Sequence, residues 1–84
     1  MRVLIVEDTH RLRETLTDGL RAAGYAVDAV SDGRRGLIHA RTTEYDLIVL
    51  DIMLPELDGL SLLARLRKAG ATTPVLVLSA RDRV

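Results

Sequence analysis

Three carboxylates stand where two apolar runs of the sequence end. Glu7 and Asp8 directly follow Val3–Val6, and Asp51 directly follows Leu47–Leu50. Neither run alternates between apolar and polar residues, which is typical of parallel strands covered on both faces. If the two strands are neighbours, the three carboxylates meet at one edge of the sheet. Their mutual repulsion would then favour a hard divalent cation at that edge.

Asp51 is a candidate nucleophile or metal ligand, because open α/β sheets bind ligands at the carboxyl ends of their strands. Taken singly, each acid has a simpler interpretation. Asp51 could end a strand in a turn, and Asp8 could cap the helix that follows it. The combination favours a shared site, because Ser79 also stands at the end of a predicted strand.

The elements that must position these side chains follow from the apolar pattern. Strands of a parallel sheet alternate with helices of about 10–15 residues, joined by right-handed crossovers. In chain order, the sequence predicts a strand at Val3–Val6, a helix from Thr9 to a stop at Gly24, a strand at Tyr25–Val30, a helix at Arg34–Thr42, a strand at Asp46–Leu50, a helix from the capping Asp58 to Gly70, and a strand at Val75–Leu78.

Helical periodicity also predicts which side chains are buried. In the first helix Leu12, Leu16 and Leu20 form one apolar stripe, and Thr17 belongs to the face in water. In the second helix the small stripe is Gly36, Leu37 and Ala40. In the third helix the buried face and its edge are predicted at Leu60, Leu63, Leu66 and Arg67.

Composition excludes several classes of function. The 84 residues allow one domain, and 12 basic residues balance 12 acidic ones, which argues against nucleic acid or a membrane surface as the main partner. Without cysteine there is no disulfide and no thiolate chemistry. No apolar run approaches the roughly 18 residues of a membrane span, and no signal peptide precedes the first strand. We therefore expect a soluble cytoplasmic protein.

Three segments together resemble the receiver domain of two-component response regulators, in the branch whose receivers precede a winged-helix DNA-binding domain. They are Val3–Asp8, Asp46–Gly59 with Pro55 four residues after Asp51, and Val75–Ala80. The resemblance implies a flavodoxin-like (CheY-like) fold with helices on both faces of a parallel sheet. Of its five strands four would be present, in the order 2-1-3-4.

The resemblance also implies a role for each site residue. Asp51 would accept a phosphoryl group from a sensor histidine kinase. Glu7, Asp8, Asp51 and the backbone carbonyl of Met53 would bind Mg²⁺, and the hydroxyl of Ser79 would contact the phosphoryl group and act as a switch. The chain would be a signalling domain rather than a turnover enzyme, and it would control an attached DNA-binding output without touching DNA itself.

The sequence departs from a whole receiver after its fourth strand. Residues 1–84 would form the N-terminal part of a receiver, without the fourth helix, the fifth strand with its lysine, the fifth helix or an output domain. Lys68, the only lysine, falls in the third helix. We expect weakened phosphoryl transfer, and a homodimer or larger assembly through the open edge of Val75–Leu78. The sequence also fits an excerpt from a longer chain.

Two alternatives remain open at this stage. A shortened receiver could lose phosphorylation and act only as a self-associating structural or interaction module. A metal-dependent phosphatase or hydrolase on a similar sheet is disfavoured, because such enzymes need a second acid two residues after the nucleophile and Met53 occupies that position.

Overall fold

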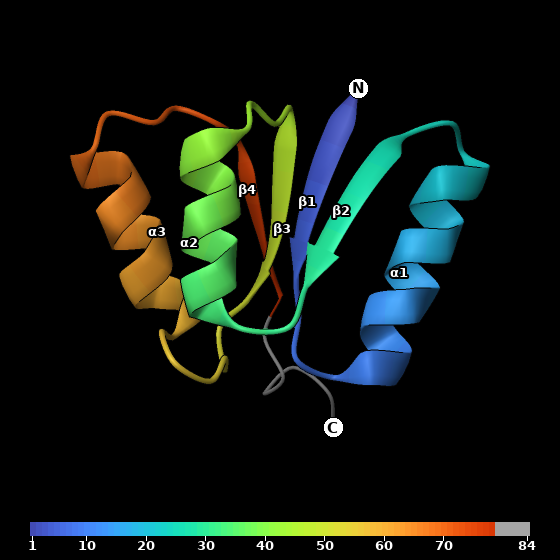
Figure 1. Ribbon diagram of the computed structural model, residues 1–84, viewed down its shortest axis with the longest axis horizontal. Coiled ribbons are helices and arrows are strands. Elements are labelled where there is room, and N and C mark those ends of the chain that lie inside the picture. Colours follow the sequence, from blue (N-terminus) through green and yellow to red (C-terminus); the bar gives the residue numbers. More distant parts are fainter. Residues whose placement is uncertain (79–84) are drawn as a thin grey trace.

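The computed structural model describes residues 1–78 as four parallel strands and three helices in strict alternation. The sheet order is β2-β1-β3-β4, as predicted from the resemblance. In Figure 1, α2 and α3 lie on one side of the sheet and α1 lies on the other. The element bounds are β1 Arg2–Val6, α1 His10–Ala22, β2 Ala26–Val30, α2 Gly33–Thr42, β3 Leu47–Asp51, α3 Gly59–Lys68 and β4 Val75–Leu78.

The order of the strands places β1 beside β3 at the centre of the sheet. The chain passes from β1 outward to β2 and then crosses back to β3 on the other side of β1. This reversal is the topological switch point, where helices on opposite faces diverge and leave a crevice at the carboxyl ends of the strands. Val6 pairs with Leu50 in the register of β1 and β3, so the residues after Val6 meet the end of β3.

Apolar side chains of the central strands are buried on both faces, which explains their unbroken apolar runs. The residues beneath α2 and α3 form one cluster, and those beneath α1 form a smaller one. The first cluster contains Leu4, Val6, Val30, Leu37, Tyr45, Ile48, Leu50, Leu62 and Leu66. The second contains Val3, Ile5, Val27 and Val49, with Leu16 and Leu20 packed against it.

Two predictions of buried helix faces were wrong. Thr17 in α1 is buried, because its hydroxyl donates to the carbonyl of Arg13 at 2.7 Å and this bond satisfies the polar atom. In α3 the buried residues are Gly59, Leu62 and Leu66, while Leu60 is 56% exposed. The buried face of α3 is rotated from the predicted one. Gly59 lies directly against the backbone carbonyl of Asp51, and this contact fixes the side of α3 that meets the sheet.

Four strand boundaries, in three strands, differ from the prediction by one residue. β1 starts at Arg2, β2 starts at Ala26 and β3 runs from Leu47 to Asp51. The shift in β3 follows from its hydrogen bonds: the Asp46 carboxylate accepts the backbone N–H of Arg2 at 2.7 Å before the strand begins, and Asp51 still pairs with Leu78 of β4.

The outer edge of β2 is partly covered by α1. Backbone hydrogen bonds from Ala26 to Met1 and from Glu7 to Val30 show that alternate residues of β2 face β1. The carbonyl of Val27 therefore points outward, and the guanidinium of Arg21 donates to it at 3.0 Å. An arginine thus occupies an acceptor on this edge of the sheet.

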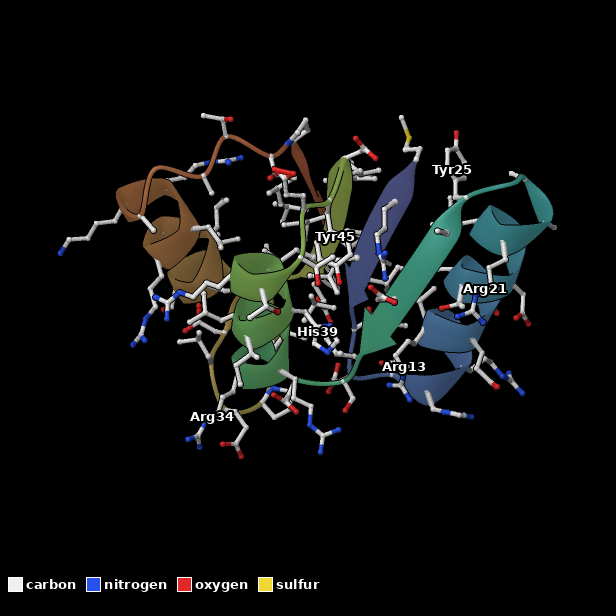
Figure 2. The ribbon with its side chains drawn as sticks, turned by 45° about the horizontal axis from the view of Figure 1, so that its top comes forward. Arg13, Arg21, Tyr25, Arg34, His39 and Tyr45 are labelled. Atoms are coloured by element: carbon white, nitrogen blue, oxygen red, sulfur yellow. The ribbon has the colours of Figure 1, made fainter. Side chains whose placement is uncertain are left out.

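A polar cluster lies on the α2 face of β2. The hydroxyl of Tyr45 donates to the carboxylate of Asp28 at 2.6 Å, and the guanidinium of Arg2 contacts the same oxygen at 3.3 Å. Figure 2 shows Tyr45 near His39 of α2. Burial, and then the bond to Asp28, raise the pKa of Tyr45 to about 12. Tyr45 is buried in the core, and its hydrogen bond to Asp28 adds a polar contact to its packing.

We expect Tyr45 to make the protein sensitive to alkali. Its pKa is higher in the folded chain than the ordinary value of about 10, so its stabilising contribution is complete below pH 10 and is lost as the pH rises to about 12. That difference corresponds to roughly 2–3 kcal/mol. Urea unfolding from pH 7 to 12 should show this loss in the unsubstituted protein and in Tyr25→Phe. Tyr45→Phe should be less stable at pH 7 and should lack the additional loss; an equal alkaline loss in Tyr45→Phe would refute the assignment.

Candidate functional site

Glu7 and Asp8 leave the carboxyl end of β1 in a tight turn. The backbone N–H of Glu7 donates to Val30 of β2 at 3.1 Å, which continues the sheet for one residue beyond the strand. The side chain of Glu7 is only 2% exposed, and one of its oxygens accepts the backbone N–H of Thr9 at 2.8 Å. Asp8 is exposed. The turn therefore holds one buried and one accessible carboxylate.

Asp51 is the last residue of β3 and is 7% exposed. It is buried although it ends its strand, because β4 pairs alongside it through Leu78. One oxygen of Asp51 accepts the backbone N–H of Met53 at 3.3 Å. This bond restrains the carboxylate at the carboxyl end of the strand.

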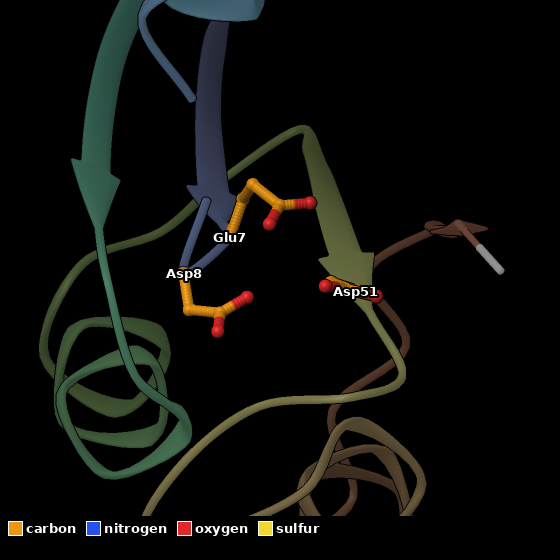
Figure 3. Close-up of side chains that lie close together, drawn as sticks. All are labelled: Glu7, Asp8 and Asp51. Carbon is orange, nitrogen blue, oxygen red and sulfur yellow. The ribbon is translucent and has the colours of Figure 1, made fainter. Parts of the chain in front are cut away.

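The three carboxylates converge, although Asp51 is far from Glu7 and Asp8 in the sequence. One oxygen from each residue lies within 4.8 Å of an oxygen of the other two. Figure 3 shows Glu7 and Asp8 at the end of β1 and Asp51 at the end of β3, around a common space. Adjacent parallel strands with the register Val6–Leu50 produce this arrangement.

None of the three carboxylates forms an ion pair with a side chain of the described residues. The ion pairs within residues 1–78 involve Asp28, Glu14 and Asp32, and none reaches the cluster. Burial raises the pKa of Glu7, and the neighbouring charge of Asp51 raises it further, while the backbone N–H of Thr9 acts in the opposite direction. Two buried anions side by side have a cost that a bound cation would remove.

The donor set fits a hard divalent cation. All three candidate ligands are carboxylate oxygens, they are close enough to share one ion, and no sulfur or imidazole is among them. Mg²⁺ typically takes one or two carboxylates and retains several waters. The exposed position of Asp8 leaves one side of the cluster open, as such hydration requires.

The loop between β3 and α3 is held in place by backbone hydrogen bonds. Glu56 has φ 70°, and the N–H of Leu57 donates to the carbonyl of Pro55 at 2.8 Å, which closes a three-residue γ-turn. The same carbonyl accepts the N–H of Gly33, at the start of α2, at 3.2 Å. The loop that follows Asp51 is therefore anchored to α2.

The predicted roles of Met53 and Ser79 are not tested by the structure. The side chain of Met53 is 59% exposed and its N–H is bound to Asp51, so the role of its carbonyl stays a prediction. Ser79 lies outside the described residues. Sequence reasoning missed Arg13, whose guanidinium contacts the turn of Glu7 and Asp8; its position four residues after the N-terminal cap of α1 is the signal that could have indicated it.

Parallel strands around a switch point, with an acidic cluster at their carboxyl ends, define an open α/β sheet with a candidate cation site. Residues 3–84 match the family described as the response regulator receiver domain. The chain belongs to this family, whose members are the receiver domains of two-component response regulators.

Several transcriptional regulators resemble the chain over its whole length. It is 54% identical over 84 residues to the transcriptional regulatory protein HprR of Escherichia coli and 55% identical to the transcriptional activator protein IrlR of Burkholderia pseudomallei. The 84 residues span 37% and 36% of these two relatives, so a receiver occupies only part of each.

Solved structures show the same fold. A receiver domain of a Francisella response regulator superimposes with a TM-score of 0.93 and is 37% identical, with 99% of this chain and 69% of that one covered. The response regulator TrrA of Thermotoga maritima, solved in complex with Mg²⁺ and BeF, gives a TM-score of 0.89 at 32% identity and covers 96% of this chain and 70% of its own. Among residues 1–78, no helix has the length and apolarity to cross a membrane.

Proposed function

We propose that this receiver accepts a phosphoryl group on Asp51 from the phosphohistidine of a sensor kinase in the cytoplasm, with Mg²⁺ bound by Glu7, Asp8 and Asp51. The observation that carries the proposal is the convergence of three carboxylate oxygens within 4.8 Å at the switch point, none of them in an ion pair with a described residue. The similar protein TrrA was solved with Mg²⁺ and BeF bound, which supports the proposal that this chain also binds Mg²⁺ and a phosphoryl group.

The chemistry follows from the position of Asp51. Its carboxylate oxygen attacks phosphorus, an O–P bond forms, and the P–N bond to the kinase imidazole breaks, so the imidazole leaves with the electron pair and takes a proton. Both reactants are anionic, and bound Mg²⁺ would supply the charge that brings them together. The bond from Met53 N–H would restrain this carboxylate for the attack.

The other site residues have supporting roles in this proposal. The carbonyl of Met53 completes the metal site, and the hydroxyl of Ser79 contacts the phosphoryl group. That contact would draw the segment after β4 toward the site and change the surface seen by an attached transcription output. The similarity to transcriptional regulators supports an output of this kind.

Titration with Mg²⁺, alone and with beryllium fluoride, tests this function. Calorimetry should show saturable Mg²⁺ binding, and beryllium fluoride should bind only when Mg²⁺ is present. Asp8→Asn should weaken both, while Asp18→Asn, on the exposed surface of α1, should weaken neither. A folded protein that binds neither ligand would instead be an interaction module, and turnover of a phosphate ester would indicate a hydrolase.

We also propose that the 84-residue chain studied by itself forms a dimer through β4. Within residues 1–78, β4 pairs with β3 on one side only. Its Leu76 and Val77 are 53% and 38% exposed, so an apolar edge is open to a second copy. Light scattering should give the mass of a dimer, Val77→Lys should give a monomer, and Ile38→Lys on α2 should leave the dimer intact. A monomeric unsubstituted chain would refute this.

A further inference from the structure

An arginine of α1 reaches back to the turn that carries two of the candidate metal ligands. The Nη1 of Arg13 donates to the backbone carbonyl of Glu7 at 3.0 Å and lies 3.4 Å from that of Asp8. Figure 2 shows Arg13 on α1, near the end of β1. One guanidinium thus contacts the two peptide groups that follow the α-carbons of Glu7 and Asp8.

The turn has few other restraints among the described residues. Thr9, the N-terminal cap residue of α1, makes no capping bond with its side chain, and the first turn of α1 contains no acidic residue. What remains is the bond from Glu7 N–H to Val30 and the bond from Thr9 N–H to the Glu7 carboxylate. Arg13 is therefore the side chain that restrains the carbonyl side of this turn.

Arg13 is itself held in place. Its Nη2 lies 3.0 Å from Nδ1 of His10, and Nε2 of His10 lies 3.0 Å from the carboxylate of Glu14. Arg13 is half-buried, so its guanidinium is less free than that of a surface arginine. A planar guanidinium can bond two carbonyls and an imidazole at once, which an ammonium group cannot do in the same geometry.

We propose that Arg13 is a positioning residue for the divalent cation site. It fixes the peptides of Glu7 and Asp8, and through them the directions of both carboxylates, before the ion arrives. A site whose ligands are already oriented binds its ion without the cost of ordering them. The inference rests on the proposed Mg²⁺ site and adds to it a residue that contacts no ligand atom of the ion.

The positive charge of Arg13 acts in the opposite direction. A cation near the site repels Mg²⁺, so removal of the charge alone would tighten binding, whereas loss of the hydrogen bonds weakens it. Arg13→Lys retains the positive charge but loses the hydrogen-bonding geometry of the guanidinium, and Arg13→Met loses both the charge and the hydrogen bonds. Arg11, also on the first turn of α1, has no side-chain hydrogen bond or ion pair within the described residues, and Arg11→Lys and Arg11→Met are matched controls.

Calorimetric titration with MgCl₂ tests the proposal. Arg13→Lys should raise the Kd for Mg²⁺ about tenfold, the scale found for residues that orient metal ligands, and Arg13→Met should raise it as well. Both Arg11 variants should stay within about twofold of the unsubstituted protein, and urea midpoints should show that all variants are folded. An unchanged Kd in Arg13→Lys, or tighter binding in Arg13→Met, would overturn the proposal.

A second measurement separates this inference from the proposed function. Amide hydrogen exchange of Thr9 without metal reports the bond from its N–H to Glu7. This exchange should be several times faster in Arg13→Lys than in the unsubstituted chain. If the unsubstituted chain binds no Mg²⁺, the proposed function fails, and faster exchange still supports the restraint by Arg13. Unchanged exchange would refute the restraint whatever the metal does.

Discussion

Asp51→Asn should abolish phosphorylation and leave the fold intact. An amide is a far weaker nucleophile than a carboxylate, so incubation with acetyl phosphate and Mg²⁺ should add no phosphoryl group to the variant. The intact mass, compared with that of the unsubstituted chain, gives the result directly. Asp58→Asn is the matched control, because asparagine caps α3 as well as the aspartate that now accepts Ser61 N–H at 2.9 Å.

The same substitution should not destabilise the protein. The amide oxygen of asparagine can still accept the N–H of Met53, and the repulsion between Asp51 and the buried Glu7 disappears. We expect the free energy of unfolding to stay equal or to rise by about 1 kcal/mol. Phosphorylation that survives in Asp51→Asn would refute the assignment of the acceptor, and a variant with a much lower urea midpoint would refute the account of its environment.

Gly33→Ala should cost about 2–3 kcal/mol of stability and disturb the site. A Cβ at Gly33 would overlap the backbone carbonyl of Leu57, in the loop between β3 and α3. This carbonyl is part of the backbone, so the loop or α2 must move to make room. Because the loop continues directly from Asp51, we also expect weaker Mg²⁺ binding.

Gly19→Ala is the matched control for that change. Gly19 lies inside α1, and a Cβ there would meet no atom within 4 Å. Alanine loses less backbone entropy than glycine when a helix forms, so this variant should be more stable by about 0.5–1 kcal/mol. Urea unfolding measures both variants. A Gly33→Ala protein as stable as the unsubstituted chain would show that the close packing of the loop is not required.

The sequence was informative where one physical rule dominated. The unbroken apolar runs of β1 and β3 predicted buried parallel strands, and with the family resemblance they led to the observed strand order. The convergence of Glu7, Asp8 and Asp51 was predicted because residues after neighbouring parallel strands must meet at one edge. The roles of these residues in metal binding and phosphorylation stay predictions that the experiments above test.

The sequence was less informative where packing between elements decides the outcome. The rotation of α3 depends on the contact of Gly59 with Asp51, which periodicity within one helix does not contain. The burial of Thr17 depends on a bond to its own helix backbone. The reach of Arg13 depends on the path of the turn before α1, and arginine is among the residue types that usually face water.

The contact between Arg21 and Val27 has a consequence for the size of any assembly. A sheet with two bare edges can add copies at both ends without limit, as fibrils do. Here one carbonyl of the β2 edge is occupied by a guanidinium at 3.0 Å, whereas β4 at the opposite edge pairs on one side only within residues 1–78. In the proposed dimer, two copies joined through β4 about a two-fold axis would turn their β2 edges outward, where the arginine would oppose the addition of further copies.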